Sequence, residues 1–446
     1  MNDDTPAAQA RPPIEQHAVR FSGDGGEYFG VWMVNVLLTI VTLGLYTPWA
    51  RRRTVQYFYG HTELADSPFE FTAPLRRMVI GFLLFAALYV AFELASNTGQ
   101  DTAVAAMLVV GAVLAPWLWG SAMRFRLGHT RWRGLRLQFQ ASWAEVYRAS
   151  WPVFALAALW LVLGFALDRM TPPQPARPPA SAGASTLVAQ AQPAPDGGAQ
   201  EEDEEATSSM ADDGDDAKLP KLPIVTPAMW GLGLLGVALS LLCLIRLEYN
   251  YKSLPVRRTL IGSQAGRWKP VYRDFVRIWL VSMGVFVLSV ALIVGVVALL
   301  GVLFGGLALL SGSRPMGMMA VVLVMALLFG GSLAIFLAAT PALAYREARM
   351  FQLMWNNIGV SDIARFRTGL GTSAFVWRRV RNSIFSVLTL GFYRPFARIN
   401  EYNMKSESVT LHLRGGLEPL VGRLSQQQQD GFGDAIGDAV GFDLIS

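Results

Sequence analysis

The sequence predicts an all-α polytopic membrane protein with six to eight transmembrane or re-entrant helices and short cytoplasmic β-hairpins. Long uncharged apolar runs recur along the chain, and runs of about 20 such residues cross a bilayer as helices. Charged residues make up 16% of the 446 residues, against about 25% in soluble domains. Basic residues gather in alternate connectors, which is the pattern of cytoplasmic loops.

On these criteria the chain divides into membrane halves, a linker and two polar ends. The parts are a disordered N-terminus at 1–20, a first membrane half at 21–167, a disordered acidic linker rich in Pro and Ala at 168–226, a second membrane half at 227–413 and a polar tail at 414–446. The predicted helices lie near 78–94, 103–119 and 151–167 in the first half and near 228–245, 278–303 and 318–344 in the second. The linker is too polar to bury the apolar surface that folding requires.

A duplicated formula marks one module at the start of the first half and another, at 366–398, near the end of the second. Its markers are Asn35, Gly44, Tyr46, Pro48 and Trp49 in the first copy and Asn382, Gly391, Tyr393, Pro395 and Phe396 in the second. Glycine suits a helix terminus, the aromatic rings suit the headgroup layer, and proline ends or kinks a helix. Upstream, Trp32 shares its spacing with Trp377, and two residues are then inserted before Asn382.

Arginine residues beside the modules are the candidates for binding lipid headgroups. They are Arg51, Arg52, Arg53, Arg76, Arg77, Arg394 and Arg398. Each base near an anionic surface contributes on the order of 1 kcal/mol to its attraction. The alternative is that these residues only anchor helix ends and set the topology.

The second module has too short an uncharged run to cross a bilayer. Its run from Asn382 to Tyr393 covers about 18 Å as a helix, against a hydrocarbon core of about 30 Å. We therefore expect it to enter and leave on the cytoplasmic side, turning near Gly391, and the first module to do the same. That gives six spans with a periplasmic linker; the alternative is seven or eight spans.

A second repeat lies in the basic connectors. His61-Thr62 and His129-Thr130 each follow a glycine and precede alternating apolar residues. This pattern predicts two short β-hairpins on one membrane face. A weaker echo is Trp355-Asn356-Asn357.

Together these motifs resemble the YjgN family of bacterial inner-membrane proteins, which are built on a domain of unknown function numbered 898. The resemblance rests on the TLGxYxPWAR block, the GHT segment and the duplicated late module, and it covers most of the chain outside 168–226. It implies a multi-pass protein of the bacterial inner membrane. It supplies no catalytic residues, because the family's activity is not established.

The expected function is that of a non-enzymatic membrane module whose Arg-rich cytoplasmic face binds anionic lipid headgroups or a partner protein, with a homo-oligomer also open. The alternative is a transporter or permease for a small solute or lipid, although the apolar runs lack ionisable residues near their centres. We expect no nucleic-acid partner, no cofactor and no catalytic or metal residues. His61 and His129 without matched carboxylates make a weak metal site.

Overall fold

A closed antiparallel barrel organises the computed structural model, which describes residues 14–170, 226–261, 264–310, 317–360, 363–418 and 421–422. Among these residues, ten strands follow one another around the barrel in the order β1-β10-β9-β8-β7-β6-β5-β4-β3-β2. The strands are β1 (Ile14–Phe21), β2 (Thr62–Leu64), β3 (Ser67–Phe71), β4 (Thr130–Trp132), β5 (Leu135–Phe139), β6 (Thr259–Ile261), β7 (Gln264–Trp268), β8 (Ile358–Val360), β9 (Ala364–Thr368) and β10 (Val409–Arg414).

The barrel shows that the predicted all-α fold is wrong. Hairpins are present at the two expected places, as β2–β3 and β4–β5, but they pair with each other through β3 and β4, and three further strand pairs complete the barrel. The physical reason is that a lone hairpin is barely stable in water, whereas a closed sheet leaves no unpaired edge. The first and last strands close the barrel, with His17 of β1 opposite Leu411 of β10.

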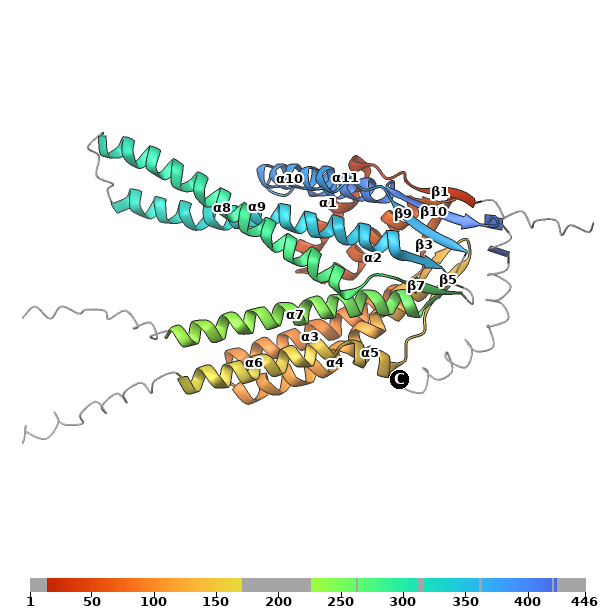
Figure 1. Cartoon of the computed structure of the whole chain (residues 1–446), viewed down its shortest axis with the longest axis horizontal. Helices are drawn as coiled ribbons and strands as arrows, with labels where there is room; N and C mark the ends of the chain where they lie inside the picture. Colours follow the sequence, from red (N-terminus) through yellow and green to blue (C-terminus); the bar gives the residue numbers. More distant parts are fainter. Residues whose placement is uncertain are drawn as a thin grey trace, which may run out of the picture. The chain divides into compact units, whose positions relative to one another are not determined.

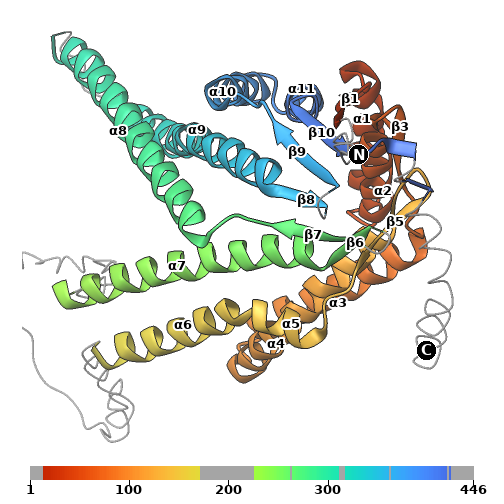
Figure 2. The ribbon, with the colours of Figure 1, turned by 45° about the vertical axis from the view of Figure 1, so that its right-hand side comes forward.

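The helices all attach at one end of the barrel strands. They are α1 (Gly25–Val41), α2 (Thr47–Gly60), α3 (Leu75–Asn97), α4 (Asp101–Gly128), α5 (Trp143–Ala149), α6 (Trp151–Met170), α7 (Pro227–Arg258), α8 (Tyr272–Leu310), α9 (Gly317–Asn357), α10 (Thr372–Leu388) and α11 (Arg394–Ser406). Each helical excursion starts from one strand and returns to its neighbour, so the hairpin turns lie at the opposite end of the barrel (Figure 1 and Figure 2).

The same unit recurs around the barrel. In four of the hairpins a strand of three residues is followed by a strand of five, and three residues then lead into the next helix. After β1, β3, β5 and β9, the first connector residue donates its backbone N–H to the carbonyl oxygen of the residue that precedes β2, β4, β6 or β10, respectively. These bonds run from Ser22 to His61 (2.9 Å), Thr72 to His129 (3.0 Å), Gln140 to Arg258 (2.9 Å) and Gly369 to Ser408 (2.9 Å). The chain is therefore an internal repeat of one helix–hairpin–helix unit.

The number of candidate membrane spans is lower than the six to eight expected. The described residues contain four helices long and apolar enough to cross a membrane, or up to five if α5 and α6, bent by 44°, are one span. These helices are α3, α4 from Thr102, α7 and α8 up to Leu299. The two modules are not among the candidate spans, because α1 and α10 have 17 residues each and the chain turns back after them. The expected run 318–344 lies in α9, whose side chains before residue 330 are outside the described part.

The helices of the two modules align residue by residue without an insertion. Asn35 and Asn382 occupy the same position in α1 and α10, which have equal lengths. Arg379, rather than Trp377, therefore corresponds to Trp32. The inserted residues inferred from the sequence are not present, and the second copy carries a charge where the first has an indole ring.

Residues 157–240 form a second compact unit that contains most of α6 and the first half of α7. Within it, a Cβ added to Gly236 would lie 2.6 Å from Cδ2 of Leu163, so glycine allows these helices to approach closely. The expected disorder does not extend to residues 14–20, which form β1. Residues 1–13, the linker at 171–225 and the tail from 423 lie outside the described residues.

Candidate functional site

The glycine of each module lies where the chain reverses between its two helices. Gly44 has φ +92° and Gly391 has φ +94°, a left-handed conformation that strains residues with a Cβ. Their backbone N–H groups donate to the carbonyl oxygens of Thr39 (2.7 Å) and Ser386 (2.6 Å). The formula thus encodes a helical hairpin with a tight turn.

The asparagine markers join the two helices of the hairpin, and the aromatic and proline markers lie at the start of its second helix. The Nδ2 atom of Asn35 donates to the carbonyl of Ala50 at 3.4 Å, and that of Asn382 donates to Ala397 at 3.3 Å. Both Asn side chains are buried. The aromatic markers stack in pairs, with ring centroids 5.9 Å apart, and each proline begins a helix. The pairs are Tyr46 with Trp49 and Tyr393 with Phe396.

The hairpin tips are apolar and exposed. Leu43 is 95% exposed and Leu390 91%, at the points farthest along the chain from the barrel strands. Ile40, Val41, Leu388 and Phe392 around them are also exposed. Exposed apolar tips on short helices suit insertion into the headgroup and acyl boundary of a bilayer.

Exposed arginine residues lie on the helices between the apolar tips or spans and the barrel. We call this set the basic belt: Arg51, Arg52, Arg53, Arg76, Arg77, Arg394 and Arg398. All are exposed except Arg52, which is half-buried. In the described part of the chain no ion pair involves any of them. Arg398 donates to the hydroxyl of Tyr28 at 3.1 Å and lies 4.9 Å from the ring centroid of Phe58.

The repeated Gly-His-Thr segment joins a helix to a strand. Nδ1 of His61 lies 2.8 Å from the carbonyl of Tyr57, and Nδ1 of His129 lies 2.7 Å from that of Phe125. Each ring thus caps the last turn of its own helix. Asn357, the weaker echo, makes the same contact with Leu353 at 2.9 Å. Among the described residues no group of three or more His, Cys, Asp or Glu is placed to hold a metal ion.

A polar contact also fixes the start of the first module. The Tyr57 hydroxyl accepts from the backbone N–H of Asp24 (3.0 Å) and lies 2.9 Å from its carbonyl oxygen. Burial, followed by the nearby Glu27 carboxylate, raises the pKa of Tyr57 to about 12. The Asp24 side chain caps α1, and the backbone N–H groups of Glu27 and Gly26 hold its pKa below the usual value.

The second module carries a network of charges that the first lacks. Arg379 forms ion pairs with Glu401 of α11 and, at 3.5 Å, with Glu347 of α9. Lys405 also binds Glu347, at 2.7 Å, and Asn382 donates to Glu401 at 3.1 Å. The first copy has Trp32, Thr54 and Phe58 at the positions of Arg379, Glu401 and Lys405, and Trp32 and Phe58 pack in a largely aromatic cluster. A hollow of about 390 Å³ borders Arg379.

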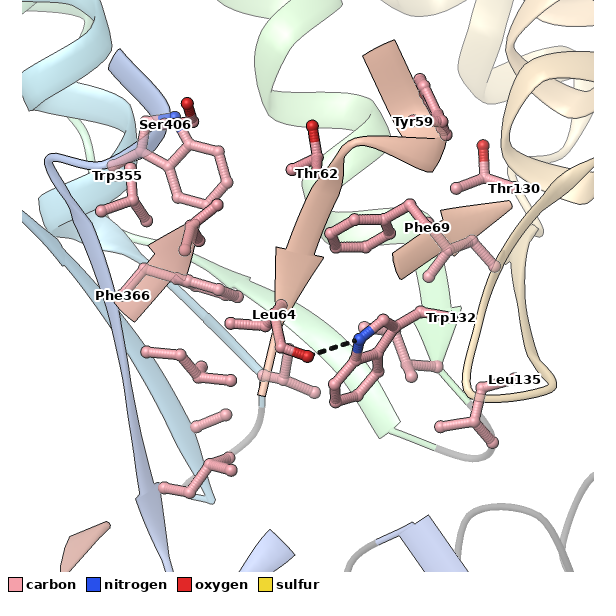
Figure 3. A pocket seen from close by; sticks show the side chains of 18 of the residues that line it. Tyr59, Thr62, Leu64, Phe69, Thr130, Trp132, Leu135, Trp355, Phe366 and Ser406 are labelled. Carbon is pink, nitrogen blue, oxygen red and sulfur yellow. Dashed lines mark hydrogen bonds between the residues drawn. The ribbon is translucent and has the colours of Figure 1, made fainter. Parts of the chain in front are cut away.

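Sequence reasoning missed a cavity that lies inside the barrel and has a volume of about 500 Å³ (Figure 3). Its wall is made by alternate residues of the strands, because successive side chains of a strand point to opposite faces. Apolar examples are Leu64, Phe69, Trp132, Leu135, Phe366 and Leu411. Arginine residues occupy intervening outward positions, such as Arg136 and Arg365, which are exposed.

The two ends of the cavity differ in chemistry. Hydroxyl groups of Thr62, Thr130, Tyr59 and Ser406 gather at the end next to the helices, and Leu64, Trp132 and Leu135 lie farther in (Figure 3). Lys405, Phe351 and Trp355 from α11 and α9 complete this mouth.

The opposite end is closed by the segment after β10. Leu417 is buried in one cluster with Leu64, Leu135 and Leu413, which line the cavity. Its backbone N–H donates to the Glu15 carboxylate at 3.2 Å. The neighbouring Glu418 pairs at 2.9 Å with the turn residue Arg133. In the described part of the chain the cavity is therefore blind at this end, and it opens towards the helices.

Comparison with known proteins agrees with the membrane character of this arrangement. A family model described as "Bacterial protein of unknown function (DUF898)" matches residues 16–439. The chain belongs to this family. The inner membrane protein YjgN of Salmonella typhimurium (strain LT2) is 30% identical over 146 residues, which are 33% of this chain and 36% of the relative. That of Escherichia coli (strain K12) is 27% identical over 149 residues, 33% and 37% of the two chains.

The chain thus matches about a third of the length of these curated relatives. The resemblance inferred from the motifs is confirmed, and the protein is a multi-pass protein of the bacterial inner membrane. No solved structure matches it.

Proposed function

We propose that the protein is a non-enzymatic membrane module that binds anionic lipid headgroups through its basic belt. The observation that carries this proposal is the position of the belt. Arg76 and Arg77 stand in the first turn of α3, where an apolar span leaves the barrel, and Arg51 and Arg394 stand on the modules below apolar tips. Exposed, unpaired guanidinium groups at such a level match the phosphates of a cytoplasmic leaflet.

The alternating surface of the barrel supports the same orientation. Most of its exposed outward positions are polar or charged, as suits a domain in water, while α3 and α8 expose apolar side chains along their length. The four basic connectors all contribute strands to the one barrel, so they lie on a single side of the membrane. By the positive-inside rule that side is the cytoplasm.

The test is retention of anionic lipid by the protein after replacement of Arg51, Arg52 and Arg53 with Gln. Three bases at about 1 kcal/mol each predict that affinity for phosphatidylglycerol falls about 100-fold at low salt, and by less at high salt because exposed charges are screened. Affinity is measured by titrating lipid into purified protein in a neutral detergent.

A matched control removes the same charge from the barrel wall. Its substitutions are Arg365→Gln, Arg367→Gln and Arg414→Gln, three exposed residues on β9 and β10. This control should retain phosphatidylglycerol. Equal losses of affinity in both triple variants would show that net charge alone causes the effect. Unchanged affinity in the belt variant would rule out headgroup binding at these residues.

A further inference from the structure

We propose that the blind cavity of the barrel is a binding site for a single acyl chain, inserted from the membrane side with its polar end at the mouth. This goes beyond headgroup binding by the basic belt and rests on different residues. The occupant's chemistry follows from the size, lining and direction of the cavity.

The size of the cavity indicates that it holds a ligand. Packed protein interiors contain few voids larger than a water molecule, whereas ligand sites have volumes of about 300–1,000 Å³. The volume here is about 500 Å³. Larger inward side chains could fill the interior of this ten-stranded barrel. The small residues Ala364 and Val409 stand at lining positions instead.

The lining selects an apolar and elongated occupant. Among the described residues that line the cavity, Lys405 is the single charged one, and its ammonium group is already paired with Glu347 at 2.7 Å. The hydroxyl of Thr62 is bonded to Tyr402 at 2.8 Å. A strand such as β5, with five residues, runs about 17 Å. An apolar cavity walled by strands of that length fits an extended hydrocarbon chain better than a compact polar metabolite, which would leave its own polar groups unpaired.

The direction of the cavity indicates the source of the chain. Its deep end is closed around Leu417, and its mouth is formed by residues of α2, α9 and α11, at the end of the barrel where the helices attach. A second hollow of about 600 Å³ shares Phe351 and Trp355 with the mouth and reaches Leu343. Its lining also includes charged side chains, those of Glu248, Lys252, Arg346, Glu347 and Arg379. The polar end of an acyl chain at the mouth would therefore lie next to charged and polar groups, while its hydrocarbon chain lies in the apolar cavity. The hydroxyl groups and Lys405 then lie beside its carboxylate or ester end.

The experiment uses two photoreactive probes on the full-length protein in lipid nanodiscs, a diazirine-labelled free fatty acid and a phosphatidylglycerol with the same diazirine chain. Cross-linked peptides are mapped by mass spectrometry. Labelling of the strand residues 135–139 and 409–413 is expected with at least one probe. Labelling by the fatty acid alone assigns a free acid as the ligand, and labelling by both assigns the chain of a membrane lipid as well.

Substitutions then test whether the labelled site is the cavity. Ala364→Phe fills it and should reduce strand labelling at least tenfold. Ala265→Phe places the same ring at an exposed position on β7 and should leave labelling unchanged. Should the filled variant fail to fold, Phe366→Ala enlarges the cavity and should shift competition towards longer unlabelled acids. Label confined to the outer surfaces of the helices, or strand labelling that Ala364→Phe does not change, would overturn the proposal.

Loss of the site is distinguishable from loss of headgroup binding. Replacing Arg51, Arg52 and Arg53 with Gln should leave strand labelling by the free fatty acid intact.

Discussion

Removing the Glu401 carboxylate should destabilise the second module, and removing Arg379 as well should restore it. Glu401 is buried and binds both Arg379 and Asn382. Loss of one partner from a buried ion pair costs about 3–5 kcal/mol, because the other charge is left without compensation. Arg379 is only two-thirds buried and keeps Glu347 at 3.5 Å, so we expect about 2–3 kcal/mol for Glu401→Thr.

The second substitution takes its residue from the first copy. Arg379→Trp with Glu401→Thr reproduces the pair Trp32 and Thr54, which the same backbone already accommodates. The hollow of about 390 Å³ beside Arg379 leaves room for the indole ring, and Glu347 keeps Lys405. Exchange of a buried ion pair for apolar packing is often neutral or stabilising, so the double variant should lie within about 1 kcal/mol of the original protein.

The assay is thermal unfolding in detergent, followed by circular dichroism at a helix wavelength so that the added Trp does not disturb the signal. Glu407→Thr, which removes an exposed carboxylate just after α11, is the control for loss of charge and should be neutral. An unchanged Tm for Glu401→Thr, or a double variant no more stable than the single one, would show that the pair is not what holds these helices together.

Two further perturbations probe the first module and the barrel. Because the pKa of Tyr57 is about 12 when folded and about 10 when unfolded, its contribution of at most about 3 kcal/mol is complete below pH 10 and is lost as the pH rises towards 12. Tm measured at pH 9 and pH 11 should therefore fall less in Tyr57→Phe than in the original protein, and an equal fall would contradict the assignment. In β7, a Cβ on Gly266 would lie 2.0 Å from the carbonyl oxygen of Val256, so Gly266→Ala should lower Tm by several degrees, whereas alanine at the open Gly128 should not.

The sequence contained enough information to locate the helices and the modules but not the barrel. The paired markers Asn35 and Asn382 make the same interhelical bond, which explains why both copies need asparagine there. Strands such as β6 and β8 have three residues each, too few for a period of two to be recognised. Each of these two strands pairs on one side with a strand more than 70 residues away in the sequence. Closure of the barrel joins β1 to β10, the first and last strands.

One signal of the barrel was present in the sequence. The echo at Asn356-Asn357 is a true third copy of the helix cap formed by His61 and His129, since Asn357 also bonds the carbonyl four residues before it. Three such caps, each followed by a strand, indicate a repeat of more than two hairpins. The cavity was not predictable in the same way, because its wall combines residues that no linear spacing relates.

Repetition also explains how one scaffold supports two chemistries. Every unit keeps the same three-residue connector, so the backbone at the barrel mouth is fixed and side chains there can differ between units. At matched positions the first module presents Phe58 and the second presents Lys405, which lines the mouth of the cavity. The charge at the mouth is thus a property of one unit alone, balanced by Glu347 from the neighbouring α9. If an anionic chain end displaces Glu347 from Lys405, Glu347 still has Arg379 at 3.5 Å, so the network can accept the ligand without leaving a buried charge unpaired.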